Sequence, residues 1–195
     1  MTESLLNYFA ATGLLAVDEI NFSLAFFKPI NLKKGDFFLR EGETCRHIGF
    51  IVHGGVKAYA TDEEGNENIT CFKFENEFAT SFSEFVAQEK SRRNIRTIED
   101  SVIYKINYPD YHYLLDQVTA WNGVIRALME QEYKQKESYL LNYNNRSAIG
   151  KYRQVLSNEP SLVGRVATQD LASYLGITQR SLTRAKGQIY RPSTL

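Results

Sequence analysis

The chain has 195 residues, of which 43% are hydrophobic and 24% are charged, and this balance is ordinary for a soluble globular protein of one large or two small domains. No apolar run reaches the ~20 residues that span a bilayer, and the N-terminus lacks a secretory signal pattern. We therefore expect a cytoplasmic protein that does not enter a membrane.

The formal net charge of zero conceals an asymmetry between the two ends of the chain. Residues 146–195 carry eight Lys or Arg and two acidic residues, a net charge of +6, which leaves −6 for the first 145 residues. A basic C-terminal module on an acidic body favours a polyanionic partner for that module.

Two cysteines, Cys45 and Cys71, are far apart and match no zinc or iron–sulfur spacing. No glycine-rich phosphate loop, nucleophile motif or metal-ligand spacing is present either. We therefore expect no metal, no cofactor and no enzymatic activity.

Residues 5–27 have apolar positions at helical spacing, which predicts short helices. From residue 30 to about residue 106, glycine-containing turns separate short runs of β-forming residues. The runs are Ile48–Val52, Val56–Ala60, Asn68–Phe74 and Ser101–Ile106. This spacing predicts an antiparallel barrel or jelly roll, a fold whose interior is a candidate pocket for a small molecule.

Residues 110–145 have Gly123 as their only glycine, and apolar residues recur every three or four positions, which predicts one helix of about 30 residues. Such a helix either packs on the roll or pairs with a second copy in a coiled coil. Trp121 and Leu128 suit both roles, whereas Glu132 and Gln135 weaken the coiled-coil interpretation of the second half.

Residues 168–189 have the pattern of a helix-turn-helix. We expect Thr168 to cap a first helix and Thr178 to cap a second. Gly176 stands where the first helix must stop in a left-handed conformation. Six apolar residues supply the packing faces of the two helices: Leu171, Ala172, Leu175, Leu182, Ala185 and Ile189. The same pattern would suit a helical corner without a DNA role, so the exposed residues decide between the two.

The outward face of the second helix carries Gln, Arg, Ser, Thr and Lys and no acidic residue. Because Arg binds guanine and Gln binds adenine through paired hydrogen bonds, we assign Gln179, Arg180 and Arg184 to base edges. The remaining candidates would contact or position the DNA backbone: Thr168, Gln169, Thr178, Ser181, Thr183 and Lys186.

A β-roll, a long helix and a C-terminal helix-turn-helix, in that order, resemble the cyclic-AMP receptor protein (Crp/Fnr) family of bacterial transcription regulators. The resemblance covers nearly the whole chain and rests on segments in a family-like order: 33–36, 40–43, 51–56, 95–101 and the helix-turn-helix. It implies an α+β fold with a cyclic-nucleotide-binding-like roll in residues 1–109, a connecting and dimerisation helix in 110–145, and a helix-turn-helix domain in 146–195. It also implies a homodimer on double-stranded DNA and RNA polymerase as a further partner.

The effector-binding part departs from the family's pattern. Nucleotide-binding members have Gly-Glu-aliphatic followed by Arg-Ser-Ala, where this chain has Thr80-Ser81-Phe82 and Ser91-Arg92-Arg93. The ribose-binding Glu is missing unless Glu84 substitutes for it, and the phosphate-binding Arg is displaced by one residue. We therefore expect an effector other than cyclic AMP, and its candidate contacts are Ser81, Phe82, Ser83, Glu84, Arg92 and Arg93.

This chain also lacks the metal-ligating residues that other sensor types of the family need. An iron–sulfur member needs four cysteines, and His47, His53 and His112 show no metal-site spacing. Only six residues follow Ile189, so we expect a reduced winged helix with little wing. The sequence thus predicts a DNA-binding transcription regulator, and the alternative is a ligand-binding or interaction module that no longer binds DNA.

Overall fold

The computed structural model describes residues 2–143 and 146–190. The chain divides into two compact units, the first comprising Met1–Ala60 and Thr70–Met129 and the second comprising Thr61–Ile69 and Glu130–Leu195. The prediction that little wing follows Ile189 concerns mainly residues 191–195, which lie outside the described residues.

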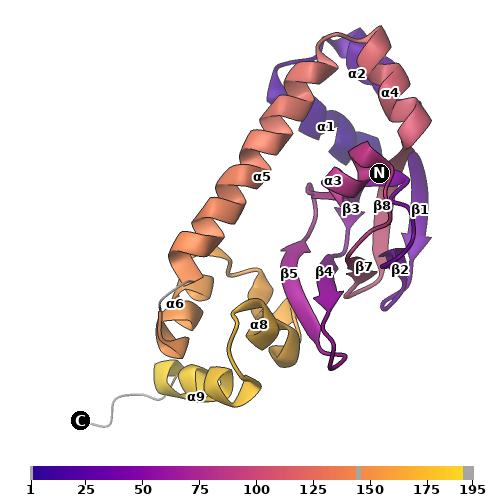
Figure 1. Ribbon diagram of the computed structural model, residues 1–195. Coiled ribbons are helices and arrows are strands. Elements are labelled where there is room, and N and C mark those ends of the chain that lie inside the picture. Colours follow the sequence, from indigo (N-terminus) through magenta and orange to yellow (C-terminus); the bar gives the residue numbers. More distant parts are fainter. Residues whose placement is uncertain (1, 144–145, 191–195) are drawn as a thin grey trace. The chain divides into compact units, whose positions relative to one another are not determined.

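The first unit holds a β-roll of two antiparallel sheets (Figure 1). One sheet has the order β1-β8-β3-β6 and the other β2-β7-β4-β5. The bounds are β1 Lys28–Leu32, β2 Phe37–Leu39, β3 His47–His53, β4 Val56–Thr61, β5 Glu67–Lys73, β6 Phe78–Ala79, β7 Asn94–Thr97 and β8 Ser101–Asn107. All four predicted strands are present, and the fold class expected from the sequence is confirmed.

Helices accompany the roll: α1 Thr2–Thr12, α2 Val17–Leu24, α3 Phe82–Ala87, α4 Tyr108–Gln117 and the beginning of α5, Trp121–Tyr143. Their aromatic side chains join the core of the roll. The Phe9 ring packs edge-on against Trp121 at 5.1 Å between centroids, and the Trp121 Nε1 donates to the Ser23 hydroxyl at 2.7 Å. This bond satisfies the indole N–H in the apolar core.

The prediction of one helix over 110–145 was wrong, because the segment forms α4 and α5. Val118 has extended backbone angles (φ −125°, ψ 93°) and ends α4. Its side chain is buried, as is that of Trp121, so packing of these two residues in the core decides where the chain turns. No glycine or proline marks the break.

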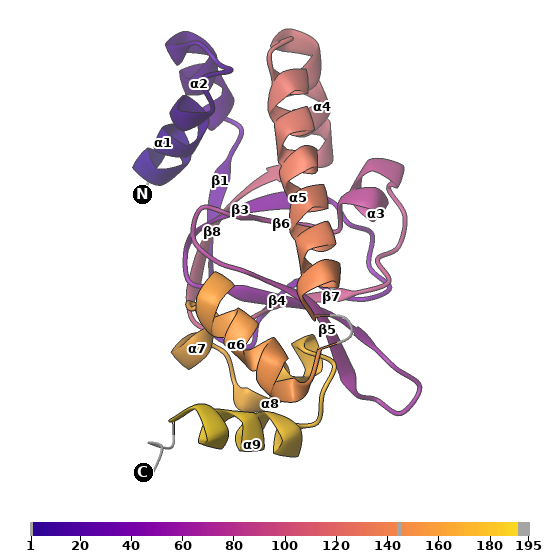
Figure 2. The same cartoon turned by 90° about the vertical axis from the view of Figure 1, so that its left-hand side faces the viewer.

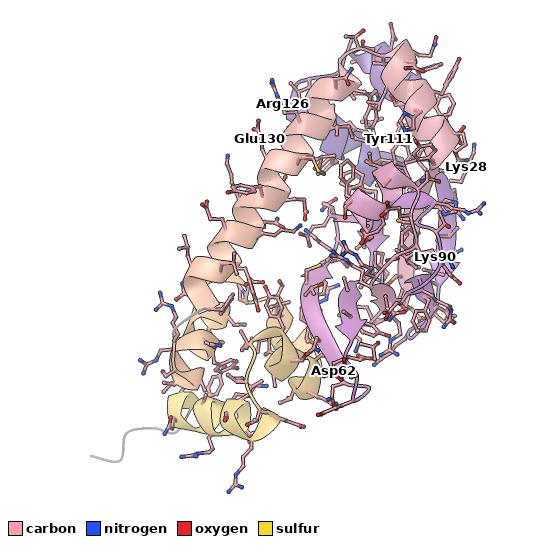
Figure 3. The ribbon with its side chains drawn as sticks, in the orientation of Figure 1. Lys28, Asp62, Lys90, Tyr111, Arg126 and Glu130 are labelled. Atoms are coloured by element: carbon pink, nitrogen blue, oxygen red, sulfur yellow. The ribbon has the colours of Figure 1, made fainter. Side chains whose placement is uncertain are left out.

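The second unit contains the tip of the β4–β5 hairpin, the rest of α5, and the helices α6 Ala148–Asn158, α7 Leu162–Arg165, α8 Thr168–Tyr174 and α9 Gln179–Tyr190. Helix α9 packs against α6 and α8 (Figure 2). Asp62 marks the hairpin tip (Figure 3), where its carboxylate accepts the backbone N–H of Glu64 and Asn66. The Ser173 hydroxyl of α8 donates to the Glu67 carbonyl and accepts from the Ile69 N–H, at 2.6 and 3.1 Å.

Candidate nucleic-acid interface

The turn between α8 and α9 is built by backbone hydrogen bonds around one glycine. Gly176 has a φ of +60°, its N–H donates to the Ser173 carbonyl, and the N–H of Ile177 donates to the Ala172 carbonyl. These two bonds form a Schellman motif, which ends α8 and redirects the chain. The left-handed glycine predicted at this position is confirmed.

One of the two predicted N-caps, Thr178, is confirmed, and the other, Thr168, is wrong. The Thr178 hydroxyl accepts the Ser181 N–H at 3.1 Å, so Thr178 caps α9 as predicted. Thr168 is not a cap: the N-cap of α8 is Ala167, which offers no side-chain acceptor, and Thr168 is the first helical residue. The acidic Asp170 in the first turn still suits the positive end of the helix dipole.

The buried face of the motif matches the prediction except at Ile189, which is half-buried. The other apolar members are almost inaccessible to solvent: Leu171, Ala172, Leu175, Leu182 and Ala185. Because Leu182 and Ala185 hold one side of α9 against the unit, the opposite side faces outward. That side exposes Gln179, Arg180, Thr183 and Arg184.

Several of the candidate DNA-binding residues contact one another. The Thr183 hydroxyl donates to the backbone carbonyl of Gln179 at 2.9 Å, and the hydroxyls of Thr178 and Ser181 lie 2.9 Å apart. Lys186 donates to Thr168 at 3.2 Å, joining α9 to the start of α8. The guanidinium groups of Arg180 and Arg184 make no such contact within the described residues, which leaves them available for an outside partner.

Basic residues before the motif divide into two kinds. Lys151 donates to the Leu175 carbonyl at 2.7 Å, so it helps to end α8. The other basic residues between position 146 and the motif are Arg146, Arg153 and Arg165. Arg146 and Arg153 are exposed, whereas Arg165 is half-buried.

The structure brings five of the six candidate effector residues together. Glu84, which is 2% exposed, accepts hydrogen bonds from the hydroxyls of Ser81 and Ser83, each at 2.7 Å. The Arg92 Nε lies 3.4 Å from the other oxygen of the Glu84 carboxylate, and Arg93 contributes a nearby positive charge. The sixth residue, Phe82, packs against the hydrophobic core instead.

Opposing effects act on the Glu84 carboxyl. Burial disfavours its ionised form, but the Ser81 and Ser83 hydroxyls and the Arg93 charge outweigh burial and lower the pKa of Glu84 to about 2. The carboxylate is therefore ionised at neutral pH and is already hydrogen-bonded within the chain. A ligand hydroxyl would have to replace these partners.

Histidine and cysteine side chains show no arrangement typical of a metal centre. Burial and the charges of Lys105 and Arg46 lower the pKa of His47, and the His112 ring lies against Tyr108 at 4.3 Å between centroids. Among the described residues, no group of three or more His, Cys, Asp or Glu side chains is placed to hold a metal ion.

A third set of residues was missed by sequence reasoning. Tyr143 and Tyr174 donate to the Glu159 carboxylate, and Tyr139 donates to the backbone carbonyl of Tyr174. The available signal was the pair Tyr139 and Tyr143, four residues apart at the end of the predicted long helix.

Comparisons with known proteins agree with this arrangement. Residues 29–118 match the family model of the cyclic nucleotide-binding domain. The chain is 21% identical over 190 residues to the fumarate and nitrate reduction regulatory protein of Vibrio cholerae, covering 92% of this chain and 74% of the relative.

Solved structures share the fold. FixK2 of Bradyrhizobium japonicum is similar with a TM-score of 0.74 at 16% identity, over 84% of each chain. A putative regulator of the Crp/Fnr family from Eubacterium rectale is similar with a TM-score of 0.72 at 16% identity, over 94% of this chain and 88% of the other.

The roll, the helix-turn-helix and these relatives make this chain a DNA-binding transcription regulator with a sensing domain. Residues 29–118 match the cyclic nucleotide-binding domain family, and over most of its length the chain is similar to regulators of the Crp/Fnr family. None of the described helices is both long enough and apolar enough to cross a membrane.

Proposed function

We propose that the chain regulates transcription as a homodimer that inserts α9 into the major groove of DNA, with Gln179, Arg180 and Arg184 at base edges. The observation that carries this proposal is the outward face of α9, where both arginines lack partners within the described residues and no acidic residue occurs. Paired hydrogen bonds from Arg to guanine supply the discrimination between bases.

The test is binding to a DNA site that the wild-type protein selects from random fragments. Arg180→Ala should weaken binding by roughly 5- to 150-fold, about 1–3 kcal/mol, and relax the preference at one base position. Arg153→Ala, on the exposed side of α6, should weaken binding to all sequences similarly and reduce the salt dependence, as expected for a phosphate contact. If Arg180→Ala binds with unchanged affinity and unchanged site preference, Arg180 does not contact base edges.

Dimerisation is proposed through α5. This helix exposes Tyr133, Leu140 and Leu141, and the first two stand seven residues apart, which is the spacing of a coiled-coil seam. Two recognition helices in such a dimer would meet half-sites about 34 Å apart, one turn of DNA.

We infer that the roll senses a small molecule through the five candidate residues that come together around the Glu84 carboxylate: Ser81, Ser83, Glu84, Arg92 and Arg93. Cyclic AMP is not the expected effector, because ribose hydroxyls would have to displace Ser81 and Ser83 from the carboxylate. Calorimetric titration with cyclic AMP and cyclic GMP tests this inference, and micromolar binding of either would contradict it.

The alternative is an interaction module without DNA binding, and two assays separate the proposals. Specific retardation of genomic fragments in a gel supports regulation, whereas no retardation at low salt supports the alternative. Transcription in vitro from a retarded promoter fragment then tests RNA polymerase as a partner and gives the sign of regulation. We expect the protein to act in the cytoplasm and to catalyse no reaction, and its curated relatives are regulatory proteins.

A further inference from the structure

Four side chains meet where α5, α6 and α8 end, and we call them the Glu159 cluster: Tyr139, Tyr143, Glu159 and Tyr174. Tyr143 donates to one oxygen of the Glu159 carboxylate at 2.5 Å, and Tyr174 donates to the other at 3.1 Å. Tyr139 donates to the backbone carbonyl of Tyr174 at 2.5 Å. One carboxylate therefore connects the last residue of α5 with the last residue of α8.

The chemistry of the Glu159 cluster favours this hydrogen-bonded state. The three rings pack on one another, with centroids 5.0–5.9 Å apart. Burial and the adjacent Glu159 raise the pKa of Tyr143 and of Tyr174 above the usual value for a phenol, so both hydroxyls remain donors. Hydrogen bonds from phenols to a carboxylate are charge-assisted and stronger than those between neutral groups.

The position of the cluster matters for DNA contact. Tyr174 directly precedes the turn at Leu175 and Gly176, so the end of α8 that Glu159 holds is the end from which α9 departs. Lys151 of α6 binds the Leu175 carbonyl at the same place. On the other side, Tyr139 and Tyr143 belong to α5, the helix along which the dimer is proposed to form.

We propose that Tyr143, Glu159 and Tyr174 are positioning residues for DNA binding, which fix the recognition helix to the end of α5 and so set the spacing between half-sites that the dimer accepts. This proposal rests on the proposed function. The base-contacting residues of α9 are not part of the cluster, so the two roles are separable by experiment.

The variants Tyr143→Phe and Tyr174→Phe each remove one hydroxyl and retain the packed ring, and Glu159→Gln removes the charge at nearly constant size. Tyr113→Phe is the matched control, because it makes the same change on α4, outside the proposed dimer seam, at a side chain that is exposed and has no hydrogen bond within the described residues. Each full-length protein is titrated with the DNA site selected by the wild type and with sites lengthened or shortened by one base pair between half-sites. Circular dichroism confirms folding at the temperature used.

The wild type and Tyr113→Phe should prefer the selected spacing. The cluster variants should bind the selected site about tenfold more weakly, which is about the contribution of one charge-assisted hydrogen bond, and should lose most of the preference for spacing. Their base preference within a half-site should be unchanged. If the cluster only stabilises the fold, its variants will have a lower melting temperature and the same spacing profile as Tyr113→Phe, and this result would overturn the proposal. If the wild type selects no DNA, the proposed function fails together with this inference.

Discussion

Replacing Gly176 with alanine tests the backbone geometry on which the helix-turn-helix depends. An added Cβ would have one neighbour within 4 Å, the Lys151 Nζ at 3.9 Å, so no steric clash is expected. The cost is then conformational, because an L-residue at a φ of +60° is less stable than glycine by about 1–2 kcal/mol. For a domain of roughly 60–100 residues, each kcal/mol corresponds to about 4–8 °C in the melting temperature.

Gly187→Ala is the matched control, because Gly187 lies inside α9 with open space where a Cβ would be and its φ is not in the left-handed region. Alanine is the better helix former there by up to about 0.8–1 kcal/mol, so this variant should be more stable than the wild type. Thermal unfolding followed by circular dichroism measures both variants. A Gly176→Ala protein as stable as the wild type, or a shift of the same sign in both variants, would refute the conformational argument.

Three further predictions concern the cap, the dimer and the buried carboxylate. Thr178→Ala removes the acceptor for the Ser181 N–H and should destabilise the protein by about 1 kcal/mol, measured by urea unfolding against Thr178→Asn, which retains an acceptor. Leu140→Glu places charge in the proposed seam and should shift the protein to a monomer in sedimentation, whereas an unchanged dimer would place the seam elsewhere. Because the pKa of Glu84 is about 2, below its usual 4.5, its ionised form contributes stability above pH 4.5 that is lost as the pH falls toward 2. The free energy of unfolding of Glu84→Gln should therefore fall less over that pH range than that of the wild type. An equal fall in both proteins would contradict the lowered pKa of Glu84.

The helix-turn-helix was predictable because its signals are local. A glycine at the end of α8, a threonine before α9 and apolar residues at helical spacing each act within a few positions of the chain. Thr168 was assigned wrongly because a capping residue type does not by itself fix the first turn, which begins one residue earlier at Ala167.

Contacts between distant residues account for what the sequence concealed. The break between α4 and α5 depends on the core, where Trp121 binds Ser23 nearly a hundred residues earlier. The role of Lys151 also depends on a distant residue. Its neighbours in the sequence predict only an exposed basic residue, but its ammonium group donates to the Leu175 carbonyl. The candidate effector residues were found by their order along the chain, whereas the mutual bonds of Ser81, Ser83 and Glu84 required the structure.

Strand β5 lies at the outer edge of its sheet, where unpaired backbone groups are a template for pairing with another chain. Ser173 binds the Glu67 carbonyl and the Ile69 N–H on one side of this strand. A small polar residue of α8 thereby caps the part of the edge at which a foreign strand could begin to pair. One hydroxyl of α8 thus occupies two of the backbone groups through which such pairing would begin.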